Sequence, residues 1–119
     1  MATAVKRKLS GSTNGKAIKV VQTATAGDTI HTAVAGTTAG TYDEIWLYAV
    51  NSSASAVKLT IEWGQADAPD GNIELTIPAE AGLTLVVPGL ILQNGMVVKA
   101  FASAANVVMI HGYVNSITD

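Results

Sequence analysis

Few residues of this chain have the types and spacing that enzymatic chemistry needs. The two histidines, His31 and His111, belong to no HxxxH or HExxH pattern, and the chain has no cysteine, so we expect no metal centre. Serines are frequent, but no GxSxG turn presents one as a nucleophile, and the carboxylates are scattered over outward strand positions and loops. The sequence therefore predicts no catalytic residue, no cofactor and a protein that is not an enzyme.

The densest acidic cluster is the pair Asp67 and Asp70, in a Gly- and Pro-containing stretch over residues 64–71. These carboxylates could bind Ca²⁺, but the stretch lacks the alternating oxygen ligands of an EF-hand loop. A solvated loop is the better interpretation.

The two tryptophans, Trp46 and Trp63, are the residues best suited to stack on a sugar. Both lie in strongly apolar stretches of a chain that has only 2 Trp, 3 Tyr and 1 Phe. Packing in the core or at a subunit contact is therefore favoured over a carbohydrate platform. For His111, a hydrogen bond within a sheet or a contact is similarly favoured over a ligand role.

Charge is scarce and unevenly distributed. Charged residues make up 13% of the chain, about half of the roughly 25% typical of soluble domains, which indicates that neighbours cover part of the surface. A surface that is merely neutral is the alternative. The first nineteen residues hold five basic side chains and no acid, net +5, whereas the rest holds two basic residues and nine acids, net −7. The five are Lys6, Arg7, Lys8, Lys16 and Lys19.

Residues 1–16 have the composition of a flexible, extended arm, because residues 10–15 are only Gly, Ser, Thr and Asn. A basic arm beside an acidic body fits docking on an acidic neighbour, with a solvated tail as the plain alternative. No aromatic residues interleave with these cations, so we do not expect nucleic acid as a partner. Neither a signal-peptide core nor a membrane-spanning run is present, and we expect synthesis in the cytoplasm without membrane contact.

Strand patterns fill the chain after residue 16, and no helical period persists. Residues 57–63 alternate strictly between apolar and polar, while residues 44–50 and 107–114 are apolar on both faces, which predicts interior strands or subunit contacts. Further strands are expected at residues 17–23, 29–34, 72–77, 83–87, 90–92 and 96–102. The result is an all-β domain over residues 17–119, an antiparallel β-sandwich or jelly roll of eight to nine strands. Contacts between copies, or with a capsid, are expected at Trp46, Tyr48, Ile110 and Tyr113.

Two stretches resemble a group of small structural proteins of tailed bacteriophages, found among the head and neck genes. They are YDEIWLYAVNSSASAVKLTIEWG and TIPAEAGLTLVVPGLILQNGMVVKAFASAANVVMIHGYVNSI, together more than half of the chain. Their patterns of strand and turn and the terminal GYVN are not catalytic signatures. The resemblance therefore implies a β-sandwich of the virion with no catalytic residues.

Within that group we expect a capsid decoration (cement) protein, which binds the outer shell of the virion across junctions between subunits of the major capsid protein. Many equivalent sites would supply avidity, and a homo-oligomer, with a trimer as a guess, would cover the low-charge flanks. A head-to-tail completion or tail protein stays open. So does a carbohydrate-binding module of a fibre or spike, which predicts Trp46 or Trp63 exposed in a groove.

Overall fold

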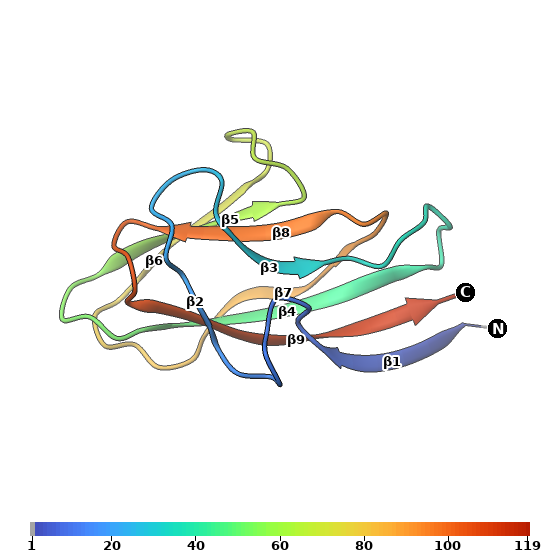
Figure 1. Ribbon diagram of the computed structural model, residues 1–119, viewed down its shortest axis with the longest axis horizontal. Coiled ribbons are helices and arrows are strands. Elements are labelled where there is room, and N and C mark those ends of the chain that lie inside the picture. The colour runs from blue at the N-terminus through green and yellow to red at the C-terminus, as the bar shows by residue number, and fades with distance from the viewer. Residues whose placement is uncertain (1) are drawn as a thin grey trace.

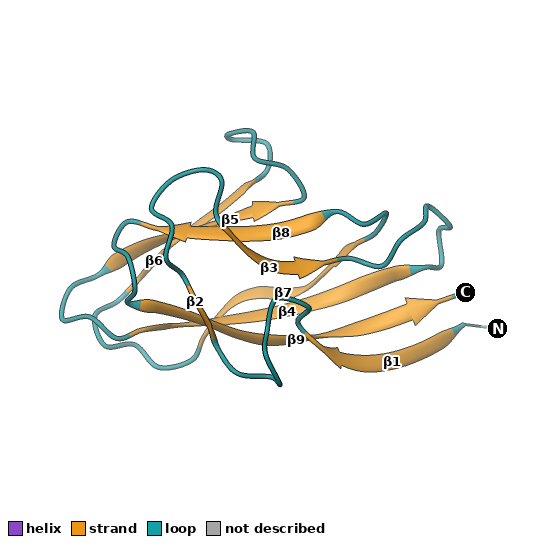
Figure 2. Cartoon of the chain, in the orientation of Figure 1, coloured by secondary structure: helices purple, strands orange, loops and turns teal. Residues whose placement is uncertain are grey.

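The computed structural model describes residues 2–119 and divides them into nine β-strands, with no helix among these residues (Figure 1, Figure 2). The strands are β1 Thr3–Lys8, β2 Ile18–Lys19, β3 Asp28–Thr32, β4 Tyr42–Asn51, β5 Val57–Trp63, β6 Asn72–Ile77, β7 Thr84–Leu92, β8 Val97–Ala102 and β9 Val108–Thr118. The all-β fold expected from the sequence is confirmed.

The strands form two antiparallel sheets, which Figure 1 shows as two layers of a β-sandwich. One sheet has five strands in the order β1-β9-β4-β7, with β2 also pairing with β9, and the other has four in the order β3-β8-β5-β6. The expected sandwich is confirmed. The jelly-roll alternative is not confirmed and stays a prediction.

The core lies between the sheets and is built from alternate residues of each strand. In β4, Ile45, Leu47 and Ala49 are fully buried, whereas Trp46 and Tyr48 are half-buried on the outer side. The other buried side chains of the core are Leu9, Val20, Ile30, Val57, Leu59, Ile61, Ile77, Val87, Val98, Ala100, Ala102, Val108, Ile110 and Val114. Burial of each large aliphatic side chain stabilises the fold by about 1.5–3 kcal/mol relative to exposure.

β4 and β9 pair along the whole length of β4 in the middle of the five-stranded sheet. They correspond to the two stretches that are apolar on both faces. Gly112 of β9 lies opposite Leu47, where an added Cβ would come within 2.1 Å of the Trp46 carbonyl oxygen. Glycine at this position therefore permits the close approach of the two central strands.

The N-terminal segment does not form the free arm that its composition predicts. β1 pairs with the C-terminal part of β9, from Thr3 opposite Thr118 to Lys8 opposite Tyr113, and the next residue, Leu9, is 1% exposed in the core. A flexible arm over residues 1–16 is therefore not confirmed. The physical reason is that one edge of β9 would otherwise leave its backbone N–H and C=O groups without protein partners, which β1 supplies.

The connection between β2 and β3, residues 20–27, crosses the outer face of the four-stranded sheet. The Ala102 N–H donates to the Gln22 carbonyl at 3.1 Å, and an added Cβ at Gly27 would lie 2.4 Å from the Ala100 backbone. In Figure 1 this connection arches over β8. We call it the β2–β3 loop, and it covers part of that sheet.

Candidate interaction surface

The outward side chains of β4 and β9 form a continuous surface on the five-stranded sheet, here called the aromatic face. Four of the six aromatic residues of the chain lie on it: Tyr42, Trp46, Tyr48 and Tyr113. Every outward residue of both strands keeps a partly exposed side chain, while the inward residues of β4 are buried. The surface is accessible in the single chain.

Three of the four contact residues expected from the sequence, Trp46, Tyr48 and Tyr113, lie on the aromatic face. Ile110 does not, because it is 0% exposed within the core. Successive residues of a strand point to opposite faces, so Ile110 shares the inward phase of Val108. When a strand is apolar on both faces, its sequence does not show which of its residues point into the core. The contact role of the three others stays a prediction.

Neighbouring residues hold Trp46 in place. Its ring is nearly parallel to that of Tyr113, with an interplanar angle of 12° and centroids 6.3 Å apart. The Nζ atom of Lys6 lies 4.6 Å from the centroid of the Tyr113 ring. On the β7 side, an added Cβ at Gly89 would come within 2.8 Å of the Trp46 ring. Aromatic side chains ordered in this way lose little conformational entropy when they bind a partner.

Glu44 fixes the polar edge of the indole. Its Oε1 atom accepts hydrogen bonds from Trp46 Nε1 at 2.8 Å and from Asn115 Nδ2 at 2.9 Å. These bonds, first that of Trp46 and then that of Asn115, lower the pKa of the Glu44 carboxyl, against an opposing contribution from desolvation. The carboxylate therefore has an intramolecular role in positioning the aromatic face.

β7 extends the aromatic face with aliphatic side chains. Leu85 lies opposite Tyr48 and Ile91 lies opposite Glu44, and these two side chains are 47% and 56% exposed. Leu83, directly before β7, is 66% exposed. The strand has the sequence TLVVPGLIL and carries no charged residue. One margin of the face is thus aliphatic and uncharged.

The five basic residues of the N-terminal segment do not form one cluster, because strand pairing places them on different sides of the sheet. Pairing with β9 places Lys6, Lys8 and Lys19 on the side of the aromatic face. Arg7 occupies the opposite phase of β1 and lines a cavity between the sheets, to which Lys8 also contributes. Lys16 is exposed in the connection between β1 and β2.

A buried polar pair that sequence analysis missed lies at that cavity, which has a volume of about 490 Å³. His31 Nε2 lies 2.7 Å from Asp43 Oδ2, and both side chains are 5% exposed. The Ser10 N–H donates to His31 Nδ1 at 3.0 Å, so the hydrogen-bond pattern assigns the ring proton to Nε2. Both ring nitrogens are therefore engaged, and the pair joins the end of β1 to β3 and β4 rather than activating a nucleophile.

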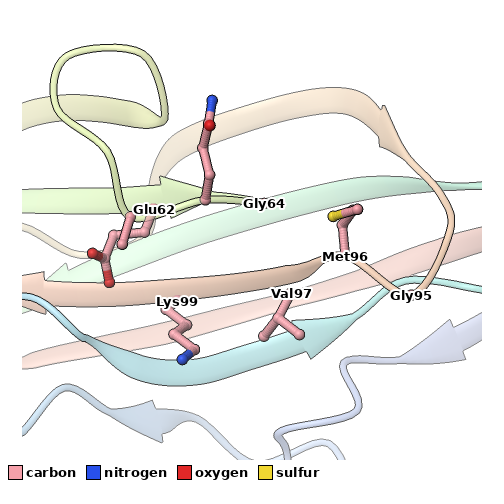
Figure 3. Close-up of a pocket in the computed structure, with 8 residues that line it drawn as sticks. Glu62, Gly64, Gly95, Met96, Val97 and Lys99 are labelled. Atoms are coloured by element: carbon pink, nitrogen blue, oxygen red, sulfur yellow. The ribbon is translucent and has the colours of Figure 1, made fainter.

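A second cavity, of about 270 Å³, lies on the four-stranded sheet (Figure 3). The residues labelled there are Glu62, Gly64, Gly95, Met96, Val97 and Lys99. Glu62 is 1% exposed, and its two oxygens accept hydrogen bonds from Thr25 Oγ1 at 2.7 Å and from the Gly27 N–H at 2.6 Å. Since both oxygens fasten the β2–β3 loop, this carboxylate is a structural group.

The remaining candidates are dispersed. Trp63 is half-buried and packs against the core. Asp67 and Asp70 are exposed in the loop over residues 64–71, and no group of three or more His, Asp or Glu residues that could hold a metal ion occurs within residues 2–119. His111 lies on the aromatic face opposite Tyr48. The aromatic face is thus where the candidate residues gather.

No protein-family model, curated protein or solved structure matches the chain. Within residues 2–119, no helix is long and apolar enough to cross a membrane.

Proposed function

We propose that this chain is a non-enzymatic structural protein of a virion, a capsid decoration protein that binds the major capsid protein through its aromatic face. The observation that carries the proposal is the placement of Tyr42, Trp46, Tyr48 and Tyr113 on one accessible sheet face. Tyrosine and tryptophan are enriched at protein interfaces, where they account for much of the binding energy.

Two further properties support a contact function. Only 13% of the residues are charged, so a solitary, fully solvated domain would have an unusually neutral surface. The buried carboxylates of Asp43, through Oδ2, and of Glu62, through both oxygens, form hydrogen bonds that fasten the fold. The resemblance to phage head and neck proteins supplies the choice of the virion and of the capsid surface.

The test is binding to particles from which the protein has been stripped. Trp46→Ala should weaken binding by at least about tenfold, the effect of losing one interface anchor. Phe101→Ala is the matched control, because Phe101 is a partly buried aromatic residue of the other sheet. Circular dichroism should show that both variants keep the β-sheet signal. Equal occupancy of the two variants would contradict the proposal.

Cryo-electron microscopy of the reconstituted particle tests the location. Density on the outer shell, at junctions between capsid subunits, is the expected result, and its symmetry would report whether the copies form a trimer. Density at the neck or tail would instead identify a head-to-tail completion or tail protein.

A carbohydrate-binding module is the second candidate, and one observation favours it. Trp46 and Tyr113 are partly exposed on one sheet face, and an accessible aromatic ring can stack on a sugar. Binding to a glycan panel that is lost in Trp46→Ala would support this candidate over capsid decoration.

A further inference from the structure

Three lysines form a row along one margin of the aromatic face. Lys6 and Lys8 of β1 lie opposite Asn115 and Tyr113 of β9, and Lys19 of β2 lies opposite Met109. Positions 109 to 115 span about 20 Å at roughly 3.3 Å per residue. β1 and β2, which both pair with β9, thus build one cationic margin, which we call the lysine margin.

The lysine margin is not neutralised by the chain itself. Lys6 lies over the Tyr113 ring, Lys8 Nζ donates to the Ser12 carbonyl oxygen at 3.1 Å, and none of the three pairs with a carboxylate within the described residues 2–119. By contrast, the exposed Lys58 of the other sheet pairs with Glu74 at 2.7 Å. The margin therefore offers positive charge that a partner can complement.

The rest of the aromatic face offers almost no negative charge. Glu44 is the one carboxylate among the outward residues of β4 and β9, and it already accepts two hydrogen bonds, from Trp46 and Asn115. The far margin, β7, has no charged residue. Across the sheet the surface runs from cationic through aromatic to aliphatic.

This distribution of charge across the sheet limits how two copies of the chain can pair through their aromatic faces. If the two-fold axis ran along the strands, the lysine margin of each copy would meet the uncharged β7 of the other. If the axis ran across the strands, lysines would face lysines. Neither arrangement supplies carboxylates, so pairing of two aromatic faces leaves the lysine margin uncompensated.

We infer that the aromatic face binds an acidic protein partner, whose surface has an apolar centre and a row of carboxylates along the side that meets Lys6, Lys8 and Lys19. The contact is heterologous, with different surfaces on its two sides. Under the proposed function, on which this inference builds, the partner surface belongs to the capsid shell.

Carbodiimide cross-linking of the intact assembly tests the pairing directly, because the reagent joins a lysine amine to a carboxylate only when the two are in contact. Mass spectrometry should find Lys6 or Lys19 linked to Asp or Glu residues of another protein. Links to this chain's own Asp67 or Asp70 would identify a second copy as the occupant and overturn the inference. Absence of links from either lysine, while Trp46→Ala abolishes assembly, would also overturn it.

Charge reversal provides the second measurement, with controls from the same segment. Lys6→Glu and Lys19→Glu should each weaken binding to stripped particles about tenfold, mainly through slower association, and the loss should shrink as salt is raised. Arg7→Glu is the matched control, since Arg7 neighbours Lys6 in β1 but lies in the opposite phase. Lys16→Glu controls for charge in the connecting loop. These two should change the affinity less than about twofold.

The two proposals can fail separately. If Lys6→Glu and Arg7→Glu bind equally well while Trp46→Ala does not bind, the result supports binding through the aromatic face. It contradicts the inference that the partner is acidic. If cross-links from the lysine margin lead to a protein outside the capsid shell, the acidic partner is correct and capsid decoration is wrong.

Discussion

The two outer faces of the sandwich differ in what covers them. On the four-stranded sheet, the β2–β3 loop lies across β8, and the buried carboxylate of Glu62 accepts hydrogen bonds from Thr25 and Gly27 of that loop. On the five-stranded sheet, every outward residue of β4 and β9 stays partly exposed. One face is partly covered by the chain itself, and the other is left accessible.

The polar groups on the two faces differ in the same way. Glu62 is 1% exposed, and removing it would leave a backbone N–H and a hydroxyl beneath the loop without partners. Glu44, on the aromatic face, orients the Trp46 ring and stays partly exposed. A carboxylate thus stabilises the fold on one side and positions an exposed side chain on the other.

The largest effect on the free energy of unfolding should come from releasing the β2–β3 loop from the four-stranded sheet. We expect Glu62→Ala to lower the free energy of unfolding by about 3 kcal/mol, because buried donors lose a charged acceptor. Glu74→Ala is the matched control on the same face, since Glu74 forms an exposed ion pair with Lys58, and it should cost less than about 1 kcal/mol. Urea unfolding of the two variants measures the difference, and equal losses would show that the loop is not fastened by Glu62.

Sequence patterns predicted the strands of this fold better than the conformation of its N-terminal segment. Strict alternation in β5 and the apolar character of β4 and β9 require no distant information, because side-chain periodicity is local. The sequence predicts a flexible arm there, because three of the six β1 residues are basic and a stretch of only Gly, Ser, Thr and Asn follows at residues 10–15. The conformation of β1 depends on the free edge of β9, more than a hundred residues away in the chain.

β7 illustrates a second limit of local patterns. The sequence predicts two strands broken at Pro88 and Gly89, yet β7 continues through both residues as an edge strand. An edge strand tolerates a missing N–H, and two register shifts against β4 absorb the irregular backbone. The pair His31 and Asp43 was missed for a related reason, because contact between β3 and β4 side chains leaves no local spacing to detect.

A medium effect should come from disturbing Trp46 through its neighbour Gly89. Gly89→Ala places a Cβ 2.8 Å from the Trp46 ring at a φ of +77°, and we expect a loss of about 2–3 kcal/mol. Gly95→Ala is the control, because Gly95 has a φ of +67° but nothing within 4 Å of an added Cβ, so only the backbone strain of about 1 kcal/mol applies. Measured in a Trp63→Phe background, the fluorescence of Trp46 should change only in Gly89→Ala. An unchanged spectrum there would show that Trp46 is not held against β7.

The smallest effect should be a pH response confined to the aromatic face. Because the folded-state pKa of Glu44 lies below its ordinary value of 4.5, the stabilisation from its hydrogen bonds is complete above the unfolded pKa and is lost as pH falls through the folded pKa. The Trp46 Nε1–H resonance in NMR spectra should therefore shift with a midpoint below 4.5. Glu44→Gln should abolish that shift, and the Trp63 resonance, from the other sheet, should not share it. A midpoint at or above 4.5 would mean that the indole and amide bonds do not stabilise the carboxylate, and the aromatic face would then lack the internal support that distinguishes Trp46 from an ordinary exposed side chain.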